Sequence, residues 1–411
     1  MKRTVLTIIA LIFGIWLCLG QNVQTQKDIE LKYQNAIESA QKNFNQKNYA
    51  QAKQDYQNAI KIKPENADFI NEIIDEIDKL IPFGTNQNVV KQSTYTGIIV
   101  PGATLTEKLK WLQRSAESHN TYVLEINANE NIAPTTLEYK GAINITLVLK
   151  GDYTNRTIRL SSNGTMFTIN TNVTFILDNN ITLQGHSQNT GGSMVVVNGG
   201  ILKMNAGATI TGNNDNGSSN VGAGVYLRSG TFEMSGGTIS ENSTSEGGGV
   251  YVSNGTFTIN GGTISGNTAK RSGGGVHTKN GAFTMNGGTI SGNTAQGEGG
   301  GVYGYSVAMS DGIISGNKAT KGGGISGNLT MRGGTITGNT ATEYGGGVYG
   351  RIDTKTGGTI TGYSSDSKNG NVVNDGSGVL ARRGHAIYYS TWSIIQRKET
   401  TAGPGTVNWD E

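Results

Sequence analysis

The stretch that decides the fold is GGTISGNTAKRSGGGVHTKNGAFTMNGGTISGNTAQGEGGGVY, which runs from Gly261 to Tyr303. It contains GGTISGNTA twice and GGGV twice, each time 26 residues apart. Glycine supplies 62 of the 411 residues, whereas proline supplies only 5. Because glycine adopts positive φ angles without steric cost, its return at fixed places indicates turns that recur once per structural unit.

Three columns of apolar residues extend this repeat in both directions. Members of the first column are 22 to 29 residues apart, and they are Leu183, Ile210, Ile239, Ile264, Ile290, Ile314, Ile336 and Ile360. The second column is Val225, Val250, Val276, Val302, Ile325 and Val348. The third is a pair, Leu202/Met204, Phe232/Met234, Phe257/Ile259, Phe283/Met285, Val307/Met309 and Leu329/Met331. Each repeat is therefore expected to hold three short strands separated by turns.

Three such strands and their turns occupy about 22–27 residues, which matches one coil of a parallel β-helix rising by about 4.8 Å. A propeller blade needs about 40 residues, so the spacing excludes it. One coil has no core of its own, but stacked coils join the three columns into one. We therefore predict an all-β right-handed parallel β-helix, a solenoid of the pectate-lyase-like kind, with a small α-helical N-terminal module.

One polar column accompanies the core. The asparagine of the SGN motif and its equivalents recurs as Asn213, Asn242, Asn267, Asn293, Asn317 and Asn339. Amide side chains stacked one coil apart can donate to and accept from each other, so we interpret the column as a structural ladder. A ligand-binding role for these asparagines is the less favoured alternative.

At these residues the chain resembles right-handed parallel β-helix repeat proteins of bacterial surfaces, with repeats similar to those of chlamydial polymorphic outer membrane proteins. That family carries FxxN and GGA[ILV] motifs. Here the corresponding stretches are ISGN, which ends at Asn267, Asn293 and Asn317, and GGGV or GAGV, which ends at Val225, Val250, Val276, Val302 and Val348. Ile replaces the family's Phe, and Gly replaces its Ala. The resemblance covers roughly residues 160–390 and implies adhesion or surface display.

The N-terminus has the pattern of a secretory signal peptide. Lys2 and Arg3 precede an apolar run that ends at Leu19, and a small-residue site predicts cleavage after residue 20. Two alternatives stay open: a lipid anchor at Cys18, and an uncleaved membrane anchor. The expected location is secreted or in the bacterial cell envelope, with membrane contact only through the signal peptide or a lipid at Cys18.

A helical module is expected over residues 26–82. Its packing residues stand where one tetratricopeptide repeat has them, and they are Ala40, Phe44, Tyr49, Ala52, Tyr56, Ala59 and Pro64. The module resembles one such repeat. One repeat buries its own face poorly, since about three are usual, so it is interpreted as a spacer or as a site for a protein partner.

The remaining boundaries follow from composition and pattern. Residues 83–103 are expected to be a linker, and 104–165 a capping helix with the first strands of the β-helix. Thr104 and Glu107 fit a capping box, and the helix is expected to reach His119. Residues 166–384 carry the repeats, and the aromatic run of 385–411 is expected to form a C-terminal cap.

Composition excludes several functions. The net charge is +3 and no basic stripe with interleaved aromatic residues occurs, so nucleic acid is not an expected partner. The four histidines have no mutual spacing suited to a metal, so neither a metal nor a cofactor is expected. Thr256/Thr258 fits the flat Thr-x-Thr arrays of ice-binding β-helices, but the equivalent pair Thr231/Glu233 breaks the pattern, so ice binding is not expected.

The surface feature most suggestive of function is a column beside the inward valines, which reads Tyr226, Tyr251, His277, Tyr303, Ser326 and Tyr349. Rings stacked at about 4.8 Å could bind sugar rings, or could only stabilise each other by about 0.5–1.5 kcal/mol per pair. We predict a non-catalytic surface protein, an adhesin or a binder of glycan or of a host or cell-surface protein. The alternative is a polysaccharide lyase or glycoside hydrolase, for which Glu246 and Glu298 are the nearest acidic candidates.

Overall fold

The computed structural model describes residues 25–45, 49–66, 70–71, 73–74, 95, 97–152, 154–215, 222–363, 368–376, 378–379 and 385–388. The expected signal peptide with Cys18, most of the linker and most of the C-terminal cap lie outside these residues. The chain divides into two compact units, Met1–Val89 and Val90–Glu411. No helix in the described part of the chain combines the length and hydropathy that crossing a membrane requires.

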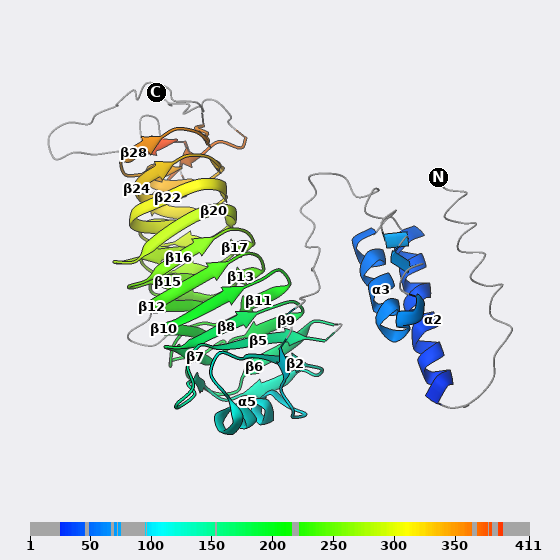
Figure 1. Ribbon diagram of the computed structural model, residues 1–411. Helices are drawn as coiled ribbons and strands as arrows, with labels where there is room; N and C mark the ends of the chain where they lie inside the picture. The colour runs from blue at the N-terminus through cyan, green and yellow to red at the C-terminus, as the bar shows by residue number, and fades with distance from the viewer. Residues whose placement is uncertain are drawn as a thin grey trace. The chain divides into compact units, whose positions relative to one another are not determined.

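The first unit is a pair of helices that lie side by side, α2 (Thr25–Asn45) and α3 (Tyr49–Ile62), followed by the short helix η1 (Pro64–Asn66) (Figure 1). Its small core contains Tyr33, Ile37, Ala40, Ala52, Tyr56, Ala59, Ile70, Ile73 and Ile74. Asp55 joins the helices by accepting hydrogen bonds from Ser39 Oγ at 2.6 Å and Asn43 Nδ2 at 2.8 Å. The side chains of Phe44 and Tyr49 lie outside the described residues.

The second unit is a parallel β-solenoid of about 10 turns, as predicted (Figure 1). Its strands form three long faces. The first face carries the predicted column of aromatic rings and is called the ring face. It contains β4 (Thr135–Leu137), β7 (Phe167–Asn170), β15 (Val250–Val252), β19 (Val276–Thr278), β27 (Val348–Tyr349) and β31 (Ile387–Tyr388). Three longer strands begin on this face and continue onto the second, β10 (Val195–Met204), β12 (Val225–Met234) and β24 (Ile325–Met331). One strand, β22 (Val302–Ser315), continues onto the third face as well.

The second face also contains β1 (Ile98–Ile99), β2 (Thr121–Ile126), β5 (Ile145–Gly151), β8 (Val173–Leu177), β16 (Thr256–Ile259) and β28 (Ile352–Lys355). From it β20 (Ala282–Ser291) runs onto the third face. The third face contains β3 (Glu130–Ile132), β6 (Arg156–Leu160), β9 (Ile181–Gln184), β11 (Ala208–Thr211), β13 (Thr238–Ser240), β17 (Thr263–Ser265), β25 (Thr335–Thr337) and β29 (Thr359–Ile360).

A fourth set of short strands was not predicted. It consists of β14 (Ser243–Thr244), β18 (Thr268–Ala269), β21 (Thr294–Ala295), β23 (Lys318–Lys321), β26 (Thr340–Tyr344) and β30 (Val372–Val373). These strands pair in parallel with each other and bury the small residues Ala269, Ala295 and Ala319. Most are too short to show an alternating pattern, so the sequence presents them as turns.

The solenoid core follows the predicted columns because each repeat places like residues in register. Phe232, Phe257 and Phe283 stack coil on coil, with centroids 4.6 Å and 5.4 Å apart. Val250 pairs with Val276, and Ile264 pairs with Ile290. All of these side chains are buried in one continuous cluster, so the solenoid is stabilised between neighbouring coils rather than within one coil.

The N-terminal end of the solenoid carries helix α5 (Leu105–Ser115), which Figure 1 shows at one end of the stack of strands. Thr104 and Glu107 form the expected capping box. Leu105, Leu109 and Leu112 enter the solenoid core, which gives the helix the apolar contact that a cap needs. The helix ends at Ser115 rather than His119, because Ala116 is extended.

The triple glycines allow successive coils to approach closely where the ring face begins. Gly273 has φ +68°, and a Cβ there would lie 2.6 Å from His277 Cβ. A Cβ at Gly275 would lie 2.6 Å from the Gly301 carbonyl oxygen of the next coil. Real Cβ atoms do not tolerate such distances, so the GGG motif is required by the turn that positions the ring face.

The asparagine column forms hydrogen bonds from coil to coil. The Oδ1 atom of Asn293 accepts from the backbone N–H of Asn267 at 3.0 Å and from Asn267 Nδ2 at 3.0 Å, and Asn293 repeats both bonds with Asn317. The same arrangement joins Asn213 to Asn242 by the backbone bond, and Asn242 to Asn267, Asn317 to Asn339 and Asn339 to Asn371 by both bonds. Asn189, which the sequence analysis missed along with Asn371, donates to Asn213 at the other end.

Candidate functional site

The candidate site is a column of rings on the ring face. In six consecutive coils, from β12 to β27, a GGG or GAG turn is followed by an inward aliphatic residue and then by an outward one. The strand register places Tyr226 beside Tyr251, Tyr251 beside His277 and His277 beside Tyr303. Because strands on this face are parallel and in register, the outward side chains lie directly above one another. The structure therefore brings together four of the predicted ring residues in consecutive coils.

The rings of this column contact each other. Tyr226 and Tyr251 meet edge to face, with centroids 5.6 Å apart and planes at 75°. His277 lies between Tyr251 and Tyr303, with both centroid distances 4.7 Å. Contacts of this kind contribute roughly 0.5–1.5 kcal/mol per pair beyond the buried area, so the column stabilises the outside of the sheet.

The middle of the column is less accessible than its outward direction suggests. Tyr251 is 5% exposed and His277 is 6% exposed, and each packs between the rings of the coils on either side. Burial raises the pKa of Tyr251 to about 12, with Glu246 adding to the effect. Burial also lowers the pKa of His277, against an opposing effect of Glu246. The ring faces of these two residues are therefore not free to stack on a ligand, whereas Tyr226, Tyr303 and Tyr349 are half-buried.

The ring column is interrupted at Ser326, which pairs with Tyr303 in one coil and with Tyr349 in the next. The Ser326 hydroxyl is buried and donates to Glu298 Oε2 at 2.9 Å. Beyond the gap a second group of rings forms, in which Tyr388 lies 5.9 Å from Tyr349 and 4.4 Å from Tyr344. The structure thus separates Tyr349 from the other predicted ring residues and gives it Tyr344 and Tyr388 as neighbours, which the sequence analysis missed.

A column that contains three charged residues runs along one side of the rings, and each of its members stands just before a triple glycine. Backbone hydrogen bonds of the glycine turns join its members coil to coil, and they are Glu246, Ser272, Glu298, Lys321 and Tyr344. Glu246 is 3.6 Å from Arg271, and Lys321 is 3.9 Å from Glu343 and lies over the Tyr349 ring. Glu246 and Glu298 are two coils apart, each with a partner of its own.

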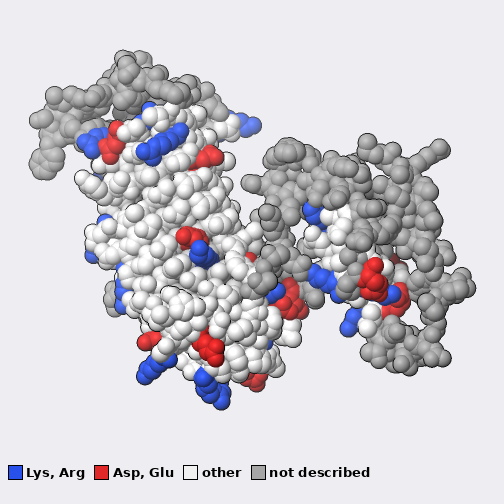
Figure 2. Space-filling model, viewed as in Figure 1, with Lys and Arg blue, Asp and Glu red and all other residues white. Residues whose placement is uncertain are grey.

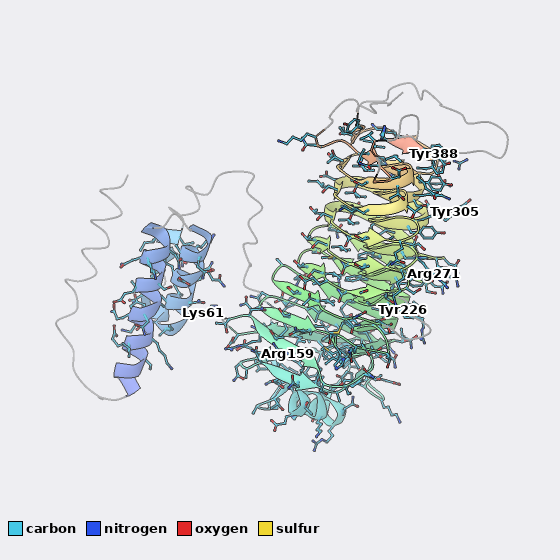
Figure 3. The ribbon with its side chains drawn as sticks, turned by 180° about the vertical axis from the view of Figure 1, so that it is seen from behind. Lys61, Arg159, Tyr226, Arg271, Tyr305 and Tyr388 are labelled. Atoms are coloured by element: carbon cyan, nitrogen blue, oxygen red, sulfur yellow. The ribbon has the colours of Figure 1, made fainter. Side chains whose placement is uncertain are left out.

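A second outward column lies on the other side of the rings, two residues further along each strand. Leu227, Val252, Thr278 and Gly304 are in register, and the residues that follow them point outward as Arg228, Ser253, Lys279 and Tyr305. Arg228 and Lys279 are exposed, and Tyr305 is 82% exposed, which makes it the most exposed large apolar side chain among the described residues. Figure 3 labels Tyr226 and Tyr305 on this side of the solenoid. Tyr305 escaped prediction because it lies at a register shift between Tyr303 and Ser306.

The third face carries an array of outward hydroxyl groups that was not predicted from the sequence. From β11 onward its outward pairs are Thr209/Thr211, Thr238/Ser240, Thr263/Ser265, Thr289/Ser291, Ile313/Ser315, Thr335/Thr337 and Thr359/Thr361, of which only Ile313/Ser315 lacks one of its two hydroxyl groups. Figure 2 shows how few charged residues one side of the solenoid presents. Hydroxyl groups alone do not specify a class of ligand, and no described residue of this face adds an aromatic ring to them.

Metal-binding clusters are not present among the described residues, where no three His, Cys, Asp or Glu side chains come together suitably. His277 packs in the ring column, and His385 Nδ1 accepts from the backbone N–H of Val373 at 2.8 Å. His186 Nδ1 accepts from the backbone N–H of Gln188 at 3.2 Å. These histidines therefore have structural partners in three separate places.

Comparisons with protein-family models, with curated proteins and with solved structures gave no match to this chain. The fold and the surface just described consequently define a class only: a parallel β-solenoid with a ring column on one face and a small helical unit before it.

Proposed function

We propose that the protein is a non-catalytic surface-binding solenoid whose ring face holds a glycan along the solenoid axis. The observation that carries this proposal is the run of four contacting rings with the exposed Tyr305 beside it. The buried rings Tyr251 and His277 make the surface rigid, while Tyr303 and Tyr305 offer partly free rings on one strand. Rigid aromatic side chains supply contact area at low entropic cost, which favours binding of an extended ligand.

A glycan array with purified protein tests the proposal, and Tyr305→Ala is the informative variant. Since Tyr305 is 82% exposed, its removal should leave the melting temperature unchanged while lowering glycan binding at least about fivefold. The matched control is Ile313→Ala, which removes an apolar side chain that is 45% exposed on the third face. Glycan binding that Tyr305→Ala does not weaken, or an array with no bound glycan, would contradict the proposal.

The alternative function is hydrolysis or elimination on an acidic polysaccharide by Glu246 and Glu298. Two coil rises place their backbones about 9.6 Å apart, near the upper end of the carboxylate separation of inverting glycosidases, which is about 6.5–9.5 Å. The ion pair of Glu246 and the hydrogen bond of Glu298 to Ser326 support structural roles instead. Release of reducing sugar that Glu246→Gln and Glu298→Gln abolish would favour the enzyme.

Location and partners belong to the same proposal. The signal-peptide pattern supports a secreted or envelope-bound bacterial protein, and the helical unit supports a protein partner. Its exposed apolar side chains include Leu31, which is 61% exposed on α2. Fractionation of cells that express the full chain, with a Cys18→Ser variant, tests the location: an anchor at Cys18 predicts that the variant moves from the membrane to the soluble fraction.

A further inference from the structure

We infer that the ligand of the ring face is an acidic glycan whose anionic groups recur about once per disaccharide, recognised by Arg228 and Lys279. The inference rests on the proposed function, because it names the chemistry of the glycan that the ring face would hold. It begins from the second outward column, which runs parallel to the rings.

The cations near the ring face fall into two groups. Arg271, Lys321 and Arg351 lie near acidic partners, which are Glu246, Glu343 and Asp353 respectively. Arg228 and Lys279 form no ion pair among the described residues, and both are exposed. Arg228 lies over the Tyr226 ring, with its Cζ atom 5.6 Å from the centroid. This column therefore presents two positive charges that have no acidic partner within the part of the chain that the structure describes.

The spacing of these two charges is fixed by the solenoid. Arg228 follows Leu227, and Lys279 follows Thr278, which is two coils further along the same register. Two rises of about 4.8 Å place the positions about 9.6 Å apart along the axis. That distance is close to the length of one disaccharide in an extended glycan chain. The residue between them is the small Ser253, which leaves room for the intervening sugar.

The aromatic rings beside these two cations would contact the sugar rings of the same glycan. Tyr226 lies beside Arg228, and Tyr303 and Tyr305 lie one coil beyond Lys279, so sugar rings and acidic groups would alternate against aromatic and cationic side chains. The acidic residues Glu246 and Glu298 are on the opposite side of the ring column, away from Arg228 and Lys279. Charge complementarity therefore favours an anionic ligand on this side and disfavours a basic peptide.

Binding to two acidic glycans and to their neutral derivatives tests the inference. The probes are hyaluronan and polygalacturonate, each beside a carboxyl-reduced form of the same chain, measured by biolayer interferometry with the full protein. Arg228→Gln combined with Lys279→Gln should weaken binding of the acidic forms several-fold and by up to about 25-fold, since each surface ion pair contributes up to about fivefold. The control, Lys318→Gln combined with Arg332→Gln, removes two other exposed cations and should change binding less than twofold by the same reasoning.

The outcomes separate the two proposals. Binding that tolerates both carboxyl reduction and loss of Arg228 and Lys279 would overturn the acidic-glycan inference and leave glycan binding intact. Equal loss of binding in the test and control variants would also overturn it, because net charge alone would then explain the affinity. Failure of every acidic and neutral glycan to bind would overturn the proposed function together with this inference.

Discussion

Replacement of Asn293 by alanine tests the asparagine ladder. Asn293 is fully buried, and its Oδ1 atom accepts the backbone N–H of Asn267 at 3.0 Å. Its Nδ2 atom donates to the Ile264 carbonyl at 2.9 Å and to Asn317 Oδ1 at 3.0 Å. Asn293→Ala therefore leaves the Asn267 N–H buried without this acceptor and removes a donor from Ile264.

The expected cost follows from these lost partners. A stranded buried N–H costs about 1–3 kcal/mol, and each further hydrogen bond contributes about 1 kcal/mol. Asn267 Nδ2 keeps its bonds to the Ile239 and Ser265 carbonyls, so it adds little to the cost. The sum predicts that Asn293→Ala lowers the free energy of unfolding by about 3–5 kcal/mol.

Urea denaturation followed by the circular dichroism of the β-sheet measures this change. The matched control is Asn286→Ala in β20, the strand that precedes Asn293, where the exposed amide donates to Asn260 Oδ1 at 3.0 Å. That bond is open to water, so its loss should cost no more than about 0.5 kcal/mol. A difference between the two variants of less than about 1 kcal/mol would refute the claim that the buried ladder holds the coils together.

Two further predictions concern the ring face. Gly266 and Gly273 have similar φ angles of +65° and +68°, but an added Cβ would meet nothing closer than 4.0 Å at Gly266, whereas at Gly273 it would lie 2.6 Å from His277 Cβ. Gly273→Ala should therefore lower the free energy of unfolding by about 2 kcal/mol more than Gly266→Ala in the same denaturation assay. A loss of equal size in both variants would leave only the φ angle as the cause. Burial lowers the pKa of His277, so the folded state binds its proton more weakly than the unfolded state, and stability must fall as pH drops below the ordinary value of 6.5. Melting temperatures measured across this range should fall more steeply for the wild type than for His277→Tyr, and parallel curves would argue against the effect.

The sequence predicts most of the solenoid because its core obeys a repeat that is visible residue by residue. Val276, Ile290 and Phe283 each lie beneath a residue of the same kind, so alignment of the repeats already yields the strand register. The strand β18 escaped prediction because two residues show no periodicity. Asn371 escaped because its motif reads NGN and follows Asn339 by 32 residues, a longer interval than any between the other members of the column.

The candidate site is predictable only in part, because exposure depends on neighbours that the sequence does not place. Tyr251 and His277 point outward as expected, but rings above and below them leave 5% and 6% of their surfaces exposed. Tyr305 is the converse case, since an irregular register presents a ring that no repeat alignment marks. The alternation of residues along a strand predicts whether a side chain points inward or outward. The exposed fraction of an outward side chain depends also on the side chains of the neighbouring coils.

The same reasoning indicates where recognition can reside in a stacked solenoid. An inward residue contacts core residues from the coils on both sides, so changing one member of the valine or asparagine column disturbs its neighbours. The column of Arg228, Ser253, Lys279 and Tyr305 has no such constraint, since Ser253 is half-buried and the other three side chains are exposed to solvent. Each of the four is different, whereas the inward residues three positions earlier are all valine, Val225, Val250, Val276 and Val302. A surface that binds a long ligand in one alignment needs side chains that differ from coil to coil. A column of identical side chains would bind the ligand with the same affinity at every position along the axis.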